Sequence, residues 1–192
     1  GENSILIHGG ANQTLDDAFV ERVFEMAGDV ELVVLQNETS CIASILEMSL
    51  RRGLPVAFNP APMTSDVEDL PLHQLNSLIV NEIEASQLVG SGDPEELCQR
   101  MAERFPRTLC VLTAGEQGVW AAHGNDCWEQ SAHSVQAVDT TAAGDTFLGF
   151  FLAELLNRDS VPLALGMGTR AASLSVTRPG AADSIPMRSE VL

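Results

Sequence analysis

The sequence predicts an α/β fold, in which a mostly parallel sheet lies between layers of helices, and two observations carry this prediction. Short apolar runs at 32–35, 56–58, 77–80 and 109–112 have the length and composition of buried parallel strands. Longer amphipathic segments separate these runs, and this alternation is typical of βαβ units with helices on both faces of a sheet. No linker or internal repeat interrupts the pattern, so we expect all 192 residues to belong to one domain.

The predicted helices begin at residues that favour helix starts. Thr14 or Asp16 can cap a helix that runs to about Ala27, and Thr39 or Ser40 can cap the next one. This second helix is expected to end at 52, before a glycine. Further helices are predicted, in chain order, at 82–88, 93–105, 142–157 and 162–176.

Two glycine-containing stretches add detail to this pattern. Alternating runs at 119–123 and 127–131 flank the turn signal Gly124-Asn125-Asp126, which predicts an antiparallel hairpin. Gly166 and Gly168 lie where the last two helices are expected to approach each other closely.

Composition excludes several classes of function. The net charge of −17 argues against nucleic acid or an anionic membrane as a partner, because both repel an acidic surface. No apolar run approaches the roughly 20 residues of a membrane span, and no signal peptide opens the chain, so we expect a cytoplasmic protein. The cysteines have no CxxC spacing and are expected to be buried thiols; they are Cys41, Cys98, Cys110 and Cys127.

The segment from Asp139 to Phe147 carries the most chemical information. Small residues run directly into an amphipathic helix, whose unpaired N–H groups and partial positive charge favour an anion. Ala142, Ala143 and Gly144 would let a phosphoryl group approach the backbone and would stabilise its charge, while Asp145 takes a proton from an attacking hydroxyl. The alternative is that Asp145 simply occupies a first helical turn, where acidic side chains are favourable.

The stretch 139–145, DTTAAGD, resembles the DTxGAGD signature of the ribokinase-type (PfkB) carbohydrate kinases, with Ala142 in place of the first glycine. Other segments follow in the order of that family: Gly1-Glu2-Asn3-Ser4-Ile5 with Gly10-Ala11-Asn12, then Asn59-Pro60-Ala61-Pro62, and then 113–118. The resemblance covers essentially the whole chain. It implies a ribokinase-like three-layer α/β/α sandwich.

The resemblance implies an ATP site formed around a glycine loop. This loop is Thr113-Ala114-Gly115-Glu116-Gln117-Gly118, and it would lie along the phosphates and the ribose of the nucleotide. Asn81, Gly144 and Asp145 would also contact ATP, and Thr169 would lie on the adenine side. Asn81 and Glu84 match the NxxE motif that holds Mg²⁺ through water, although two such residues can equally cap a helix.

A monovalent-cation site is implied as well. The resemblance assigns K⁺, bound mostly through main-chain oxygens, to Asp139, Thr141, Ser175, Arg178, Gly180 and Ser184. The alternative for Asp139 is an ordinary Asx turn before the helix.

For the sugar, the resemblance implies contacts from Glu38, Asp145 and Asn12. The implied reaction is ATP-dependent phosphorylation of a sugar hydroxyl. D-Ribose, converted to D-ribose 5-phosphate, is the first candidate substrate, and deoxyribose, fructose or a nucleoside are the alternatives. A non-catalytic nucleotide-binding domain is the alternative from another class. A dehydrogenase is disfavoured, because no GxGxxG follows an early strand.

The chain begins in mid-pattern and without methionine. The resemblance implies that about a hundred residues precede Gly1 and carry the first strands, a sugar-binding aspartate and most of a β-lid. We therefore expect 1–192 to be the carboxy-terminal part of a single kinase domain, inactive alone, with an exposed apolar sheet edge. A homodimer formed through the lid is the implied assembly of the longer protein.

Overall fold

A six-stranded sheet forms the centre of the molecule, whose computed structural model describes residues 8–192. The strands lie side by side in chain order. Strands β1 to β4 are parallel, and β5 runs antiparallel to both of its neighbours, β4 and β6. Their bounds are β1 Val33–Gln36, β2 Val56–Asn59, β3 Ser77–Asn81, β4 Leu109–Thr113, β5 Val119–His123 and β6 Asp126–Gln130. This arrangement confirms the mostly parallel sheet and the hairpin expected at 119–131.

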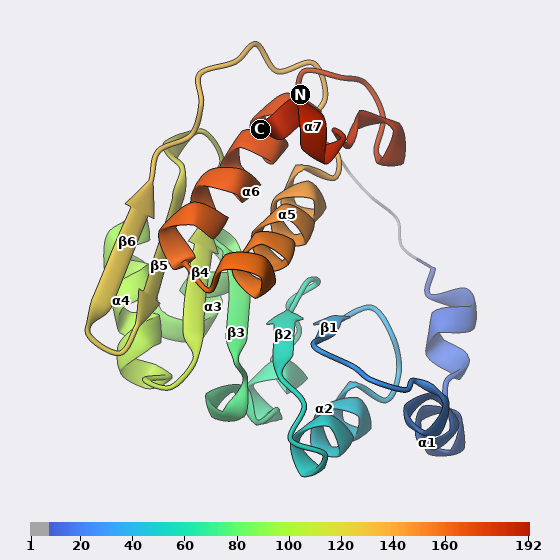
Figure 1. Cartoon of the computed structure of the whole chain (residues 1–192). Helices are drawn as coiled ribbons and strands as arrows, with labels where there is room; N and C mark the ends of the chain where they lie inside the picture. The colour runs from blue at the N-terminus through green and yellow to red at the C-terminus, as the bar shows by residue number, and fades with distance from the viewer. Residues whose placement is uncertain (1–7) are drawn as a thin grey trace.

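Helices cover both faces of this sheet, which makes three layers (Figure 1). Parallel strands joined in one direction by right-handed crossovers place their helices on the same face. One face is accordingly covered by α2, α3 and α4, and the opposite face by α5 and α6. The helices are α1 Asp17–Met26, α2 Ile42–Arg51, α3 Glu82–Val89, α4 Pro94–Arg104, α5 Ala143–Arg158, α6 Val161–Ser175 and α7 Arg188–Val191.

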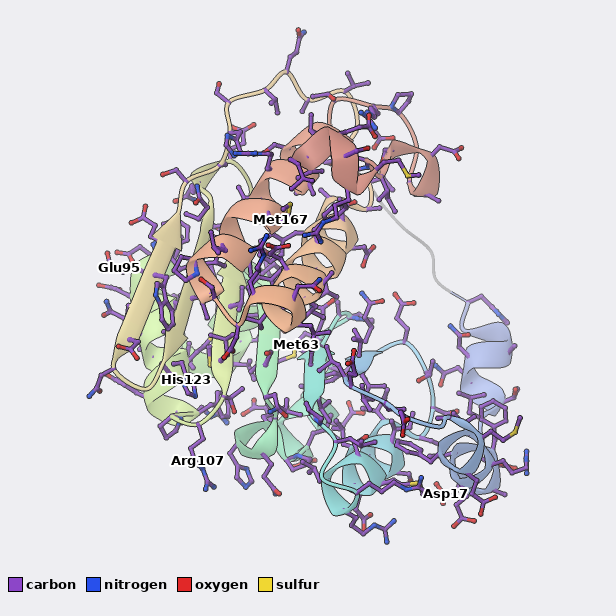
Figure 2. All side chains as sticks on the ribbon, viewed as in Figure 1. Asp17, Met63, Glu95, Arg107, His123 and Met167 are labelled. Carbon is purple, nitrogen blue, oxygen red and sulfur yellow. The ribbon has the colours of Figure 1, made fainter. Side chains whose placement is uncertain are left out.

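The apolar core is divided into two layers by the sheet. Alternate residues of β3 and β4 point to opposite faces, so Leu78 and Leu112 pack under α3 and α4 while Ile79 and Val111 pack under α5 and α6. Figure 2 shows the side chains of the described residues on the same view, with Met167 of α6 labelled.

One local prediction is wrong. The helix predicted to be capped by Thr39 or Ser40 begins after Cys41, which is the N-cap, because Ser40 Oγ instead donates to the carbonyls of Asn12 and Leu15. The run at 32–35 has the composition of a buried strand, and an exposed apolar sheet edge was also expected. In the structure β1 is an edge strand and Val34 is 49% exposed on its α5-side face, which confirms the exposed edge.

The cysteines are free thiols in the structure. Burial raises the pKa of Cys98 and of Cys110, as expected for inert core thiols, whereas Cys127 is exposed and Cys41 is partly so. Along residues 8–192, no helix combines the length and the apolar character that a membrane crossing requires.

Candidate active site

Polar residues end the four parallel strands on the side that faces α5. Gln36 of β1 pairs in register with Asn59 of β2, and Asn81 of β3 pairs with Thr113 of β4. By strand alternation these residues share a face with Ile79, which packs under α5. Ligands of open α/β sheets bind beyond the carboxyl ends of the strands, so this row of side chains marks the expected location of a site.

The start of α5 lies at this edge of the sheet. Ala142 precedes the helix with φ at 59° and ψ at 14°, in the left-handed region, and no side chain caps the helix there. Within residues 8–192 no hydrogen bond engages the backbone N–H groups of Gly144 and Asp145. Unpaired N–H groups at a helix start form a ready anion site. The left-handed φ also gives a physical reason for the glycine that the resembled signature has at this position.

Asp145 presents its carboxylate to an open cavity. The side chain is exposed, and it lines a cavity of about 780 Å³ between β1 and α5, together with Gln36 and Leu148. Its Oδ1 accepts a hydrogen bond from Gln36 Nε2 at 2.9 Å. No hydrogen bond from the described residues engages Oδ2, so this oxygen is free to accept a proton from a bound ligand.

A second cavity, of about 450 Å³, lies on the other side of the start of α5. It is lined by Gly115 and Gly118 of the glycine loop, by Gly144 and by Thr169 of α6. The loop contains a short 3-10 turn, and Ala114 N–H donates to the Gly118 carbonyl at 2.9 Å. Since Gly144 lines one cavity and Asp145 lines the other, the start of α5 lies at the boundary between the two.

Thr169 has an unusual hydrogen-bonding state in this second cavity. Its side chain is only 7% exposed, and its Oγ1 is the buried side-chain polar atom that lacks a partner among residues 8–192. A buried hydroxyl without a partner is costly, so a ligand that supplies one would gain from this position.

The residues expected to hold Mg²⁺ lie together at the start of α3. Asn81 and Glu84 form a capping box, in which each side chain accepts from the other's backbone N–H at 2.9 Å. Burial raises the pKa of Glu84, and its Oε1 accepts no hydrogen bond from the described part of the chain. The capping interpretation is confirmed, and the Mg²⁺ interpretation stays a prediction, for which the free carboxylate oxygen of Glu84 leaves an acceptor for water around a hard cation.

The residues expected to bind K⁺ are divided by the structure into two groups. The Asp139 carboxylate accepts from the Thr141 hydroxyl at 2.6 Å and from the Thr141 and Gly180 N–H groups at 2.9 Å, and these bonds lower its pKa. The Asx turn is therefore present, and the loops at 139–141 and 178–180 are tied together.

Four carbonyl oxygens on these two loops are left available for a monovalent cation. Those of Asp139, Thr141, Arg178 and Gly180 accept no hydrogen bond in the described structure. The two serines are engaged elsewhere, because Ser175 Oγ donates to Ala172, Ser184 Oγ donates to Ala181, and the Ser175 carbonyl accepts from Arg178.

Two of the residues expected near the sugar, Asn12 and Glu38, lie beyond the end of β1 in segments joined by hydrogen bonds, and neither lines the cavity of Asp145. Ser40 N–H donates to the Asn12 carbonyl at 2.9 Å, and Gln13 Nε2 donates to the Glu38 carbonyl at 3.1 Å. The Glu38 side chain is exposed and lies two residues past Gln36. Asn12 belongs to a 3-10 helix at Gly10–Thr14, while the expected motif at 1–5 lies outside the described residues.

Sequence reasoning missed two parts of the site. The contact of Gln36 with Asp145 was not expected, although Gln36 ends its strand on a polar residue as Asn59 and Asn81 do. The segment Ala132–Val135, which lines the second cavity, carries no motif that could have identified it.

Comparisons with known proteins agree with this geometry. The family model described as pfkB family carbohydrate kinase matches residues 1–188. A ribokinase of Staphylococcus aureus is 33% identical over 198 residues, covering 100% of this chain and 65% of that protein. A deoxyribokinase of Salmonella typhimurium is 29% identical, covering 96% of this chain and 62% of that protein.

Solved structures show the same likeness. The structure of Arabidopsis thaliana ribokinase complexed with ribose and ATP matches with a TM-score of 0.85 at 30% identity, over 100% of this chain and 64% of that one. A ribokinase from Thermotoga maritima matches with a TM-score of 0.83 at 33% identity, over 100% of this chain and 64% of that one. The chain thus spans just under two thirds of the length of these relatives.

Proposed function

This chain belongs to the pfkB family of carbohydrate kinases, and on that premise we propose that the protein transfers the γ-phosphoryl group of ATP to a sugar hydroxyl. The observation that carries the proposal is the position of the α5 start between two cavities. ATP would occupy the cavity with the glycine loop, and the sugar would occupy the cavity with Asp145. The uncapped N–H groups between them would receive the migrating phosphoryl group.

In this mechanism Asp145 is the general base. Its free Oδ2 takes the proton of the sugar hydroxyl, and the resulting alkoxide oxygen bonds to the γ-phosphorus as the bond from phosphorus to the β,γ-bridging oxygen breaks. ADP leaves with the bond electrons, and the proton remains on Asp145 until the product departs. The N–H groups of Ala142 and Gly144 stabilise the negative charge that develops on the equatorial oxygens, while that of Ala143 donates to the Thr140 carbonyl at 3.3 Å.

Two cations complete the proposed site. Mg²⁺, with waters held by Asn81 and Glu84, supplies charge neutralisation at the phosphates when bound. K⁺ would be held by the unengaged carbonyls of the two loops at 139–141 and 178–180, which lie close together because Gly180 donates to Asp139. This cross-link would keep the loop before α5 in the shape that directs its N–H groups.

D-Ribose is the leading substrate, and the product would be D-ribose 5-phosphate. The ribokinase bound to ribose and ATP supports this choice, since its structure matches the whole chain. Deoxyribose is the second candidate, because deoxyribokinases also match at 29% identity. Competition between the two sugars in the same assay would rank them.

The test replaces Asp145 with Asn in the complete gene product and measures ADP release with ribose, ATP, Mg²⁺ and K⁺. Loss of a general base is expected to lower kcat by about 100-fold or more, while ATP still binds. The matched control is Asp159→Asn, at the opposite end of α5, where a left-handed φ of 49° suits Asn. A rate within about tenfold of wild type in the Asp145 variant would remove this residue as the base. ATP binding without turnover in the wild-type protein would favour the non-catalytic alternative.

A further inference from the structure

The Gln36 side-chain amide joins two elements that are 109 residues apart in the sequence. Its Nε2 donates to Asp145 Oδ1 at 2.9 Å and to Asn59 Oδ1 at 3.2 Å. Asn59 Nδ2 in turn donates to the carbonyl of Ile79 at 2.9 Å. These four residues form one chain of hydrogen bonds, which we call the amide relay, from the backbone of β3 to the start of α5.

The direction of every bond in the amide relay follows from its first member. A backbone carbonyl can only accept, so the NH₂ group of Asn59 must face Ile79 and its oxygen must face Gln36. Gln36 then meets that oxygen with its own NH₂ group, whose second N–H is left to donate to Asp145. The end of the relay that faces Asp145 is therefore fixed as a donor.

The sheet register explains why these side chains meet. Gln36 and Asn59 are directly paired residues at the ends of neighbouring parallel strands, so both side chains emerge on the same face. The ladder between β2 and β3 pairs Phe58 with Leu78, and one residue further the Asn59 side chain takes up the Ile79 carbonyl. The amide relay thus connects the end of the sheet to the start of α5 through two side-chain amides.

No other described residue that lines the cavity of Asp145 can donate a side-chain N–H to its carboxylate. Of the described residues that line this cavity, Gln36 is the one with a side-chain N–H group, and the other polar residues are Asp29 and Glu31. Among residues 8–192, no lysine or arginine lines the cavity. A neutral amide therefore orients the carboxylate without forming an ion pair with it.

We propose that Gln36, held by Asn59, is a positioning residue that fixes the carboxylate plane of Asp145 and leaves Oδ2 directed at the acceptor hydroxyl. This inference rests on the proposed function, since it assumes that Asp145 is the base. General-base catalysis requires the carboxylate within hydrogen-bond reach of its proton, and a displacement of about 1 Å can cost about 100-fold in rate. Anchoring through the backbone of β3 gives the carboxylate a rigid reference in the sheet.

The kinetic test uses Gln36→Leu, Asn59→Leu and the double variant in the complete gene product. Gln36→Leu is expected to lower kcat by about 10–100-fold with KM for ATP unchanged, because neither residue lines the nucleotide cavity. Asn59→Leu is expected to cause a smaller loss, although Asn59 does not line the Asp145 cavity. The double variant should match Gln36→Leu alone, since Asn59 acts only through Gln36. Gln87→Leu, an exposed glutamine of α3, is the control.

A pH profile separates orientation from a general structural defect. Gln36→Glu keeps the shape of the side chain but replaces the donor with a carboxylate that repels Asp145. Its kcat relative to wild type should rise as pH falls, because a protonated Glu can donate in place of the amide. Additive losses in the double variant, a Gln36→Leu kcat within twofold of wild type, or a flat ratio for Gln36→Glu would each overturn the proposal.

The contact itself can be judged without any turnover. In the complete gene product, the side-chain NH₂ resonances of Gln36 should shift and exchange faster with water on Asp145→Ala, and should be unchanged by Asp159→Ala. If Asp145→Ala leaves the Gln36 NH₂ resonances unchanged, the amide relay is refuted even if the protein is a kinase. A wild-type protein without kinase activity refutes the proposed function and the catalytic part of this inference, whatever the NMR result.

Discussion

Gly168 of α6 packs closely against Phe147 of α5. A methyl group added there would lie 2.8 and 2.9 Å from ring carbons of Phe147 and 3.0 Å from the Phe147 carbonyl oxygen. The ring cannot swing aside easily, because it is 4% exposed and stacks on Phe151 with centroids 5.5 Å apart. Gly168→Ala must therefore push α6 away from α5.

The magnitude follows from a comparison with Gly166, two residues earlier on the same helix. At Gly166 the nearest atom to an added methyl is Gln130 Oε1 at 3.7 Å, an ordinary contact. Both substitutions gain about 1 kcal/mol of helix propensity, and this gain cancels between them. Gly166→Ala should thus be stabilising, while Gly168→Ala carries an overpacking cost of about 1–3 kcal/mol relative to it.

Urea unfolding of the two variants measures this difference directly, with the m-value as a check that the unfolded states are alike. For a chain of this size, each kcal/mol corresponds to roughly 2–4 °C in Tm. Phe147 and Thr169 also line the second cavity, in which we propose that ATP binds, so Gly168→Ala should weaken ATP binding while Gly166→Ala should not. Equal stability of the two variants would refute the close packing of α5 on α6.

Two further substitutions test the nucleotide cavity and the loop before α5. Thr169→Val removes a buried hydroxyl without a partner among the described residues, so thermal unfolding should show about 1 kcal/mol more stability, while nucleotide titration should show up to about tenfold weaker ATP binding. A Thr169→Val variant that loses both stability and affinity for ATP would count against Thr169 as an unpartnered hydroxyl that contacts the nucleotide. Asp139→Asn loses the carboxylate oxygen that accepts from Gly180 N–H. The bonds to Thr141 and Gly180 lower the pKa of Asp139 from 3.8. The ionised carboxylate therefore stabilises the fold above pH 3.8, and this stabilisation is lost as pH falls through the lowered pKa. The stability difference between wild type and this variant should accordingly shrink in acid, and a constant difference from about pH 7 to about pH 2.5 would contradict the cross-link.

Periodicity and capping residues were sufficient to predict most elements of the fold. Strands β3 and β4 are continuous apolar runs, and the cap at Asp93 and the turn at Gly124 are read from local chemistry that the structure retains. The N-cap of α2 was mispredicted because Ser40 forms tertiary hydrogen bonds with 12 and 15, which no local rule anticipates. The exposed sheet edge at β1 was expected from the family resemblance and not from the four residues of the strand itself.

The same distinction applies to the site. The loop before α5 and the glycine loop are local motifs, so their residues could be identified from the chain alone. The bond from Gln36 to Asp145 could not, because it depends on the register of β1 against β2 and on where α5 docks. Thr169 could be predicted only in part. Its position on the last long helix was expected, but the lack of a hydrogen-bond partner for its hydroxyl depends on how the described residues pack.

The start of α5 is held to the rest of the protein at three points, and each governs a different part of the proposed chemistry. Asp139 ties the preceding loop to Gly180, and so sets the direction in which the free N–H groups point. Gln36 ties Asp145 to the sheet. Phe147, packed against Gly168, sets the distance between α5 and the helix that carries Thr169. Because the first tie lies outside both cavities, Asp139→Asn should lower kcat with little change in the affinity for either substrate, whereas disturbing the third should act first on ATP binding.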